Sequence, residues 1–341
     1  MCHELTNRKD YLKGEPIETI YLGGGTPSQL AKEDFEAIFS HIYKVYKVTP
    51  NAEITLEANP DDLTSEYISM LRTFPFNRIS MGIQTFQETT LKQLQRRHTA
   101  DQAIRAFQGC RTAGFQNISI DLMYGLPGET LTSWKKDLKQ ALSLHPEHIS
   151  AYHLIYEEGT TLWQLREQHK LEEADEDLSV SLFGTLIDSL TAAGYEHYEI
   201  SNFCLPGFHS RHNSSYWTEK KYLGCGPSAH SYNGTSRQWN VASLDKYIEG
   251  ISSGNPTFEV EELDLYTRYN DFVITHIRTQ WGMPLPKLGK QYGEELYKYC
   301  LRMATPHLQQ GTLEIKNDTL KLTRKGVFIS DGIMSDMLWV E

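Results

Sequence analysis

Three consecutive glycines follow an apolar, strand-like segment near the start of the chain. The segment 17–22 reads Ile-Glu-Thr-Ile-Tyr-Leu, and the run Gly-Gly-Gly-Thr-Pro occupies 23–27. Without Cβ atoms, glycines let the backbone turn sharply and approach a ligand closely, so that N–H and C=O groups become available for hydrogen bonds. A tight turn between a strand and a helix uses the same residues. The run therefore predicts either a ligand-binding loop or a simple turn.

Polar side chains at the ends of later strand-like segments favour the ligand-binding interpretation. Glu57 ends the segment 53–57, Gln84 follows 78–83, and Asp121 lies in 117–122. In a parallel sheet, functional groups collect at the carboxyl ends of the strands. The glycine run, Glu57, Gln84 and Asp121 all fall near the carboxyl ends of successive strand-like segments, so we expect them at the same edge of the sheet.

The elements that must position these residues alternate along the chain. Helix-length stretches lie between the strand-like segments: 99–113 ends at Gly114, and 132–144 ends before Pro146. Further strand-like segments occupy 148–154 and 195–200. Strands that alternate with helices predict an α/β fold with a parallel sheet, either open or curled into a barrel.

Composition narrows the class of protein. The 341 residues are enough for one large domain and an appendage. The net charge of −11 argues against nonspecific binding of nucleic acid. The sequence has no apolar run long enough to cross a membrane and no secretory signal, which predicts a cytoplasmic protein, while membrane association cannot be read from it. Its five cysteines are widely scattered, unlike a disulfide framework.

Five short motifs follow one another along the first part of the chain: Gly-Gly-Gly-Thr-Pro at 23–27, Glu-Ala-Asn-Pro at 57–60, Gly-Ile-Gln at 82–84, Arg-Arg-His at 96–98 and Asp-Leu-Met-Tyr-Gly-Leu-Pro-Gly at 121–128. Their order resembles the radical S-adenosylmethionine family, and within it the oxygen-independent coproporphyrinogen III oxidase-like proteins, which include the HemW heme chaperones. The resemblance implies an incomplete (β/α)6 barrel with a smaller C-terminal domain. It also implies a 4Fe–4S cluster that reduces bound S-adenosylmethionine to a 5′-deoxyadenosyl radical.

The resemblance also assigns cofactor-binding roles. It matches Gly24, Gly25 and Thr26 to the loop that binds the amino and carboxylate groups of S-adenosylmethionine, and Glu57 to a carboxylate that contacts the same cofactor. Around a second cofactor or substrate position, the matched residues are Gln84, Arg96 and Asp121. A planar guanidinium suits a carboxylate, and an aspartate suits ribose hydroxyls or an ammonium group. The alternatives are that the glycines and Glu57 only shape the barrel, and that Arg96 joins a salt network at a helix end.

The cysteines depart from the family pattern. The family holds its cluster with a CxxxCxxC loop upstream of the glycine run, whereas this chain begins Met-Cys-His and has only Cys2 in that region. A cluster of this kind needs three thiolates on one face. We therefore expect that the first strand and the cluster loop are absent, through a late start of the gene model or a truncated product, and that the chain as written performs no radical chemistry. An unpaired edge on 17–22 would then favour homodimers.

A second motif predicts a heme site. The run 212–217 reads His-Asn-Ser-Ser-Tyr-Trp and matches the HNxxYW motif of HemW-like proteins, so the resemblance makes His212 an axial heme ligand, with Tyr216 and Trp217 beside the macrocycle. The alternative is that His212 caps or packs a loop. A zinc site from Cys204, His209, His212 and Cys225 is a weaker alternative because its spacing is loose, and we predict no metal site in this chain.

The pattern changes near residue 255, which predicts a barrel domain at 1–255 and a C-terminal domain at 256–341. Helical stretches at 263–279 and 288–305 precede a hairpin at 313–322 and a final helix, an order that resembles a winged helix. From Pro256 onward the chain has ten Lys and Arg against twelve Asp and Glu, which argues against DNA binding. We expect this domain to cover the open end of the barrel.

Together these observations predict a HemW-like radical S-adenosylmethionine protein that binds S-adenosylmethionine and heme and transfers heme to a recipient protein. The alternative is an oxygen-independent coproporphyrinogen III oxidase of porphyrin synthesis, which converts two propionate side chains to vinyl groups. A third interpretation is a binding module that uses the barrel without radical chemistry. The HNxxYW match favours the chaperone.

Overall fold

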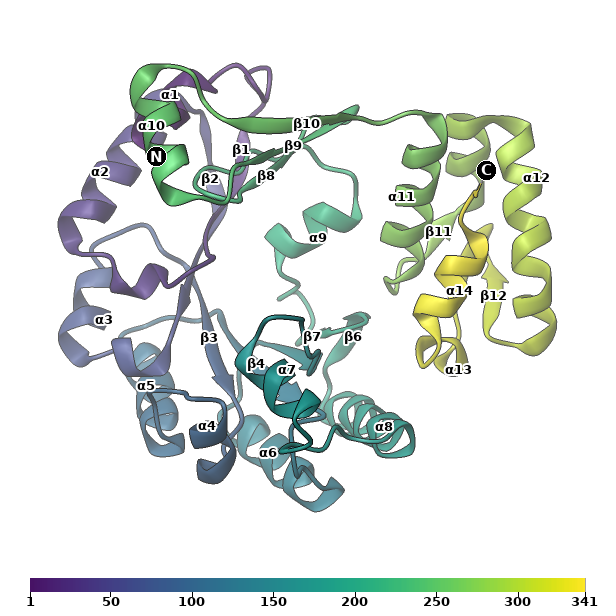
Figure 1. Ribbon diagram of the computed structural model, residues 1–341, viewed down its shortest axis with the longest axis horizontal. Coiled ribbons are helices and arrows are strands. Elements are labelled where there is room, and N and C mark those ends of the chain that lie inside the picture. The colour runs from purple at the N-terminus through teal and green to yellow at the C-terminus, as the bar shows by residue number, and fades with distance from the viewer. Residues whose placement is uncertain (341) are drawn as a thin grey trace. The chain divides into compact units, whose positions relative to one another are not determined.

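The computed structural model describes residues 1–340, and its main feature is a seven-stranded sheet (Figure 1). The strands are β1 (Ile17–Leu22), β2 (Val48–Ala58), β3 (Arg78–Gln84), β4 (Ile118–Tyr124), β5 (His148–His153), β6 (Glu196–Glu199) and β7 (Asn202–Cys204). Their order is β1-β2-β3-β4-β5-β7-β6, and β2 to β5 pair in parallel. This sheet confirms the predicted α/β fold, and it is open because β1 and β6 are its end strands.

Helices connect the parallel strands. Those between β1 and β5 are α2 (Lys32–Val45), α3 (Ser65–Leu71), α4 (Glu88–Gln93), α5 (Ala100–Thr112) and α6 (Leu131–Ser143). Helix α1 (Cys2–Asn7) precedes β1, and α7 (Thr161–Glu167) and α8 (Glu176–Ala192) lie between β5 and β6. Thr99 caps α5 by accepting a hydrogen bond from the backbone N–H of Gln102, and Thr130 caps α6 in the same way through Ser133. Such caps satisfy N–H groups that the first helical turn leaves without partners. The helices predicted at 99–113 and 132–144 are therefore confirmed.

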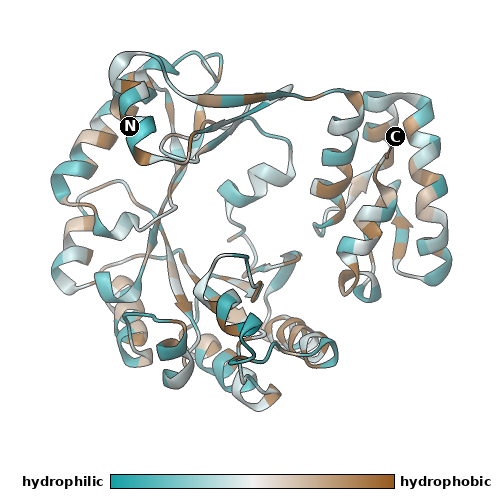
Figure 2. Ribbon diagram, in the orientation of Figure 1, coloured by the Kyte–Doolittle hydropathy of each residue, from teal (hydrophilic) through white to brown (hydrophobic). Residues whose placement is uncertain are grey.

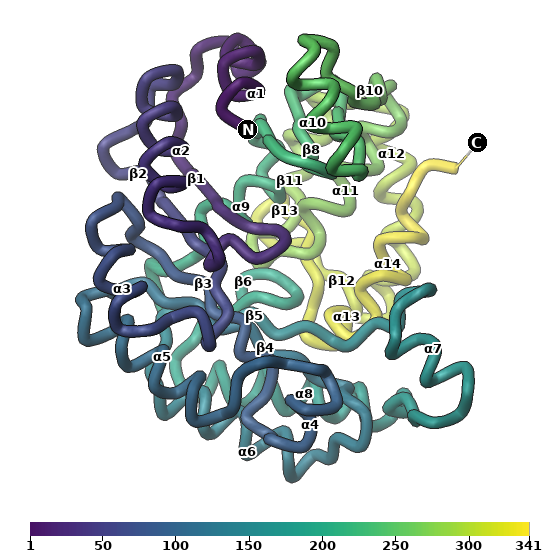
Figure 3. The backbone as a smooth tube through the Cα atoms, turned by 60° about the vertical axis from the view of Figure 1, so that its left-hand side comes forward, coloured from purple at the N-terminus to yellow at the C-terminus, as the bar shows by residue number. Residues whose placement is uncertain are grey.

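The sheet core is apolar on its strands and on the helices that cover them. The fully buried strand residues include Leu56, Ile79, Met81, Ile120 and Ile149. Helices α3, α5, α6 and α8 lie along one side of β3, β4 and β5 in two views (Figures 1 and 3). The ribbon of α8 is largely hydrophobic (Figure 2), and the buried indole of Trp134 on α6 donates to the carbonyl oxygen of Leu182 on α8. Helices on the outside thus hold the parallel strands in place.

The strand at 195–200 corrects the expectation of a uniformly parallel sheet. It forms β6, which pairs antiparallel with β7, and β7 in turn runs antiparallel to β5. Only Ile200 and Ser201 separate β6 from β7. A connection this short makes a hairpin, whereas a parallel neighbour needs a crossover of a dozen or more residues.

The remaining elements follow α9 (Arg211–Trp217). The strands β8 (His230–Tyr232), β9 (Ser236–Asn240) and β10 (Phe258–Glu262) form an antiparallel sheet, and β11 (Met283–Pro284), β13 (Thr319–Leu322) and β12 (Leu313–Lys316) form another. The helices are α10 (Leu244–Ser253), α11 (Leu265–Ile277), α12 (Leu285–Gln310), α13 (Arg324–Val327) and α14 (Ser330–Met337). The predicted hairpin is confirmed, and its turn residues Asn317 and Asp318 have φ of 50° and 55°. Positive φ at both central residues is typical of a type I′ turn.

The chain divides into two compact units, which are described separately below. The first comprises 1–19, 31–52 and 211–341, and the second comprises 20–30 and 53–210. The dividing line therefore crosses β1 and β2. Within residues 1–340, no helix combines the length and the apolar character that crossing a membrane requires.

Candidate cofactor site

The glycine run after β1 holds a carboxylate. Glu57, near the end of β2, accepts a hydrogen bond of 2.5 Å from the hydroxyl of Tyr21 and one of 3.0 Å from the backbone N–H of Gly24. Burial and the neighbouring Glu57 carboxylate raise the pKa of Tyr21, so the phenol keeps its proton and remains a donor. The loop and the carboxylate are thus one assembly at the carboxyl ends of β1 and β2.

The backbone of the loop explains why three glycines stand there. Gly24 and Gly25 have φ of 74° and 62°, which L-residues with side chains rarely adopt. A Cβ on Gly23 would lie 2.8 Å from the Glu57 Cδ, closer than atoms can pack. Gly23, Gly24, Gly25 and Thr26 are exposed, and no atom lies within 4 Å of the position that a Cβ on Gly24 or Gly25 would take. The loop therefore supports Glu57 from one side and leaves its own backbone accessible.

Arg96 lies beside a bulge in β3. Its Nη2 donates to the side-chain oxygen of Asn59, at 2.7 Å, and to the carbonyl oxygen of Gly82, at 3.0 Å. The pairing of β3 with β4 shifts register between Gly82 and Gln84, and Gln84 has a φ of 70°. A Cβ on Gly82 would lie 3.1 Å from the side-chain Nε2 of Gln84. The bulge thus brings Gln84 and Arg96 to the same short stretch of β3.

One N–H group of the Arg96 guanidinium has no partner in the described part of the chain. Its Nε is buried and makes no hydrogen bond within residues 1–340. Burial also lowers the pKa of the guanidinium, although Asp61 opposes this effect. A buried N–H without an acceptor is costly. An anionic ligand that offers two oxygens would satisfy a donor of this kind.

Asp121 on β4 lies next to Ser80, whose hydroxyl donates to its carboxylate at 3.3 Å. Ser80 is paired with Glu57 in the register of β2 and β3, so the three polar side chains follow one another across three strands. Burial is the main cause that raises the pKa of Asp121 to about 7, and the Glu57 charge adds to it, while Ser150, Arg78 and Ser80 act in the opposite direction. Asp121 therefore changes protonation near neutral pH and suits a ligand that carries a positive charge.

The second unit thus assembles most of the residues singled out in the sequence. Gly24 contacts Glu57 directly, Asp121 follows through Ser80, and Gln84 and Arg96 meet at Gly82. Three further residues position these groups and were not singled out in the sequence: Tyr21, Asn59 and Ser80. Asn59 stands in the same motif as Glu57, and that signal pointed to it. Tyr21 and Ser80 are ordinary strand residues, and only the strand register identifies them.

His212 belongs to the first unit and lies on α9. Its Nδ1 is 3.0 Å from the Thr19 hydroxyl on β1, and its Nε2 is 3.0 Å from the Tyr216 hydroxyl. Burial lowers the pKa of the imidazole to about 4, so the ring is neutral at physiological pH. A neutral imidazole has the lone pair that a heme iron requires. Tyr216 is 38% exposed, so the hydroxyl that holds Nε2 lies at the surface.

Trp217 ends the same helix. Its indole Nε1 is buried without a hydrogen-bond partner in the described part of the chain, and the guanidinium of Arg278 lies 4.2 Å from the centre of its ring. Buried indole N–H groups usually find an acceptor. The arrangement places an unsatisfied donor and a cation beside the motif that the sequence associates with heme.

The cysteines do not fit an iron–sulfur cluster. The second unit contains Cys110 and Cys204 only. In the first unit, Cys300 is fully buried within α12 and its thiol interacts with Tyr269, so it is not available to join Cys2 and Cys225. A cluster of the family's kind requires three converging thiolates, and neither unit provides them.

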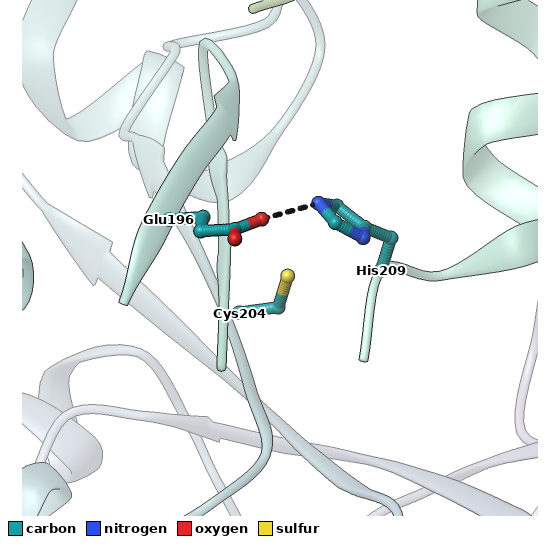
Figure 4. Close-up of side chains that lie close together, drawn as sticks. All are labelled: Glu196, Cys204 and His209. Carbon is teal, nitrogen blue, oxygen red and sulfur yellow. Dashed lines mark ion pairs between the residues drawn. The ribbon is translucent and has the colours of Figure 1, made fainter. Parts of the chain in front are cut away.

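The zinc alternative from Cys204, His209, His212 and Cys225 needs correction. Cys204 and His209 do lie together, but their third neighbour is Glu196, which the sequence analysis did not single out (Figure 4). His212 and Cys225 belong to the first unit, and neither takes part in a group with metal-binding geometry among residues 1–340.

Two family models and several known proteins are similar to this chain. The model of the radical SAM superfamily matches residues 3–141, and that of the HemN C-terminal domain matches 263–329. The heme chaperone HemW of Bacillus subtilis is 32% identical over 328 residues, which are 95% of this chain and 86% of that protein. HemW of Haemophilus influenzae is 33% identical over 341 residues, covering 99% and 87%.

The fold has a counterpart among solved structures. Coproporphyrinogen III oxidase (HemN) of Escherichia coli, a radical SAM enzyme, superposes with a TM-score of 0.85 over 98% of this chain and 81% of that chain, at 21% identity. This likeness confirms the incomplete barrel with its C-terminal domain. With the similarity to HemW along nearly its whole length, the chain belongs to the HemW family within the radical SAM superfamily.

Proposed function

We propose that this protein is a heme chaperone that binds heme through His212 and passes it to a recipient protein. The observation that carries the proposal is the neutral imidazole of His212 within an intact His-Asn-Ser-Ser-Tyr-Trp motif. The relatives support the proposal, because proteins named heme chaperone HemW are similar to this chain over nearly its whole length.

The contacts of His212 suggest how heme would be accepted. Thr19 holds Nδ1 and orients the ring, while Tyr216 occupies Nε2 through a hydroxyl at the surface. Displacing one exposed hydroxyl costs about one neutral hydrogen bond, roughly 0.5–1.5 kcal/mol, which is small beside an iron–nitrogen bond. Tyr216 and Trp217 would help to hold the heme, because aromatic rings pack well against a flat macrocycle.

We further propose that Gly24, Gly25, Thr26 and Glu57 bind S-adenosylmethionine. Their exposed backbone groups suit its amino and carboxylate groups, and the Glu57 carboxylate suits its ammonium or sulfonium charge. Gln84, Arg96 and Asp121 would form a second position for cofactor or substrate. There the Nε–H of Arg96, which has no partner among the described residues, could donate to an anionic group. The cluster chemistry of the superfamily is not assigned to this chain, because its cysteines do not fit a cluster.

A hemin titration tests the heme site. The protein should give a Soret band at saturation with one heme per chain, and His212→Ala should change the position of that band and weaken binding. Because His3 is exposed and lies outside the motif, His3→Ala is the control and should behave as the wild type. An identical spectrum and Kd in His212→Ala would exclude heme ligation by this residue.

The likeness to HemN supports a second candidate, a coproporphyrinogen III oxidase. In that case Arg96 would bind a propionate carboxylate. Each propionate would lose carbon dioxide, one hydrogen atom and one electron, which S-adenosylmethionine and an electron acceptor would take up. Anaerobic incubation of the reduced protein with coproporphyrinogen III, S-adenosylmethionine and an electron acceptor separates the two proposals. The chaperone should leave the propionates intact and transfer hemin to an apo-heme protein, whereas the oxidase should form vinyl groups.

A further inference from the structure

The β6–β7 hairpin places a carboxylate beside a thiol. Glu196 on β6 is the direct partner of Cys204 on β7 in the antiparallel register. Directly opposed residues of a strand pair carry their side chains on the same face, with Cβ atoms about 4.5–5.5 Å apart. The hairpin that the sequence analysis did not predict therefore creates this pair.

A turn after β7 adds an imidazole. The residues Leu205, Pro206, Gly207 and Phe208 form a turn in which the N–H of Phe208 donates to the carbonyl oxygen of Leu205 at 3.0 Å. Gly207 has a φ of 86°. Proline followed by glycine with positive φ is typical of a type II turn. The chain reverses direction here, which places His209 beside Glu196 and Cys204.

The three ligand-type atoms converge (Figure 4). The Glu196 carboxylate, the Cys204 sulfur and a ring nitrogen of His209 all lie within 4.8 Å of one another, and the Nε2 of His209 is 2.8 Å from Glu196. Cys204 is fully buried, while the side chains of Glu196 and His209 are 38% and 27% exposed. The sulfur is thus buried, while the other two groups are partly exposed to solvent.

We propose that Glu196, Cys204 and His209 bind one divalent cation with the chemistry of zinc. Sulfur, nitrogen and carboxylate oxygen are the ligands that zinc prefers. Tetrahedral bonds of about 2.0–2.3 Å place ligand atoms about 3.3–3.8 Å apart, so side-chain shifts of about 1 Å are enough to close the site. Magnesium and calcium prefer oxygen ligands alone and do not fit this set.

Charge and proton balance are consistent with a divalent ion. Binding releases the thiol proton of Cys204 to solvent, and the resulting thiolate and the Glu196 carboxylate together neutralise the two positive charges. His209 binds through the lone pair of one ring nitrogen and keeps its proton on the other. Tyr198 packs edge-on against the imidazole, with ring centres 4.8 Å apart, and limits its rotation. Three protein ligands leave a position for water on the exposed side, as in zinc sites that are not closed.

Cobalt titration of the chelator-treated full chain tests the site. Co²⁺ replaces zinc and reports sulfur ligation through a thiolate-to-cobalt absorption band in the near ultraviolet. We expect one equivalent to produce this band and zinc to remove it by competition. Cys204→Ser should abolish the band, while Cys110→Ser should keep it, because Cys110 is equally buried but lies on α5.

A second variant guards against misfolding of the buried cysteine mutant. Glu196 is partly exposed, so Glu196→Gln should fold normally and weaken Co²⁺ and Zn²⁺ binding at least tenfold. Proton release on zinc addition, measured in weak buffer, should fall in the same variant. The proposal is overturned if the folded wild type gives no thiolate band, if Cys204→Ser retains the band, or if Glu196→Gln binds both ions as tightly as the wild type.

Discussion

At the scale of single residues, Glu57 is the group on which the proposed S-adenosylmethionine site depends. It is fixed by Tyr21 and Gly24 before any ligand arrives, so no side-chain freedom is lost on binding. The same two contacts hold the carboxylate beside an exposed loop. Removing it eliminates a charge and one of the fixed walls of the loop.

Glu57→Ala should weaken S-adenosylmethionine binding by about 1.5–3 kcal/mol, roughly 10- to 150-fold in Kd, because a charged hydrogen bond is lost. Isothermal titration calorimetry measures this change. Glu158→Ala is the control, since Glu158 is an exposed carboxylate outside the site. Equal affinity in the wild type and Glu57→Ala would remove this residue from the cofactor site.

Asp121 makes stability depend on pH. Its pKa is about 7 in the folded protein and 3.8 in the reference state, so the unfolded chain ionises first as pH rises. Stability should therefore fall between about pH 4 and pH 7, where the folded protein still holds the proton. Asp121→Asn should be more stable than the wild type at pH 8, by about 1–3 kcal/mol, and equally stable near pH 3. Urea unfolding at these pH values checks both expectations, and equal stability at pH 8 would contradict the raised pKa.

At the scale of elements, the loop after β1 passes so close to the side chains of Tyr21 and Glu57 that Gly23 has no room for a Cβ atom. Gly23 has no positive φ, so an added methyl would cause no backbone strain and would act by displacing the Tyr21 ring and the Glu57 carboxylate. Gly23→Ala should therefore weaken S-adenosylmethionine binding about as much as Glu57→Ala. Gly128→Ala serves as a control, because its φ of 71° brings strain without contact to the site. Wild-type affinity in Gly23→Ala would show that the close packing of Gly23 against Glu57 does not matter for S-adenosylmethionine binding.

The sequence predicted those elements whose signals are local. Strand β3 and helix α5 follow from apolar runs and a capping threonine, and the hairpin of β12 and β13 from its Asn317-Asp318 turn. The β6–β7 hairpin was not predicted, because β7 has only three residues and its partner is set by tertiary pairing. For the same reason, sequence motifs could not predict that Tyr21 and Ser80 contribute to the site.

At the scale of the whole molecule, the distribution of cysteines limits the chemistry of the chain as printed. Anaerobic reconstitution with iron and sulfide should yield no stoichiometric 4Fe–4S cluster, because neither unit assembles three thiolates. Iron and acid-labile sulfide analysis, together with the absorption spectrum, measures the outcome. Four irons and four sulfides per chain would mean that the cysteines converge in another arrangement.

The open sheet has a consequence for how its curvature is set. A closed barrel has a radius fixed by its strand number and stagger, so a wider lumen requires additional strands. Here β1 and β6 are end strands, and closure imposes no such condition. Curvature instead depends on local features such as the bulge between Gly82 and Gln84. A substitution at such a bulge can therefore change the curvature of the sheet while its strand number stays the same.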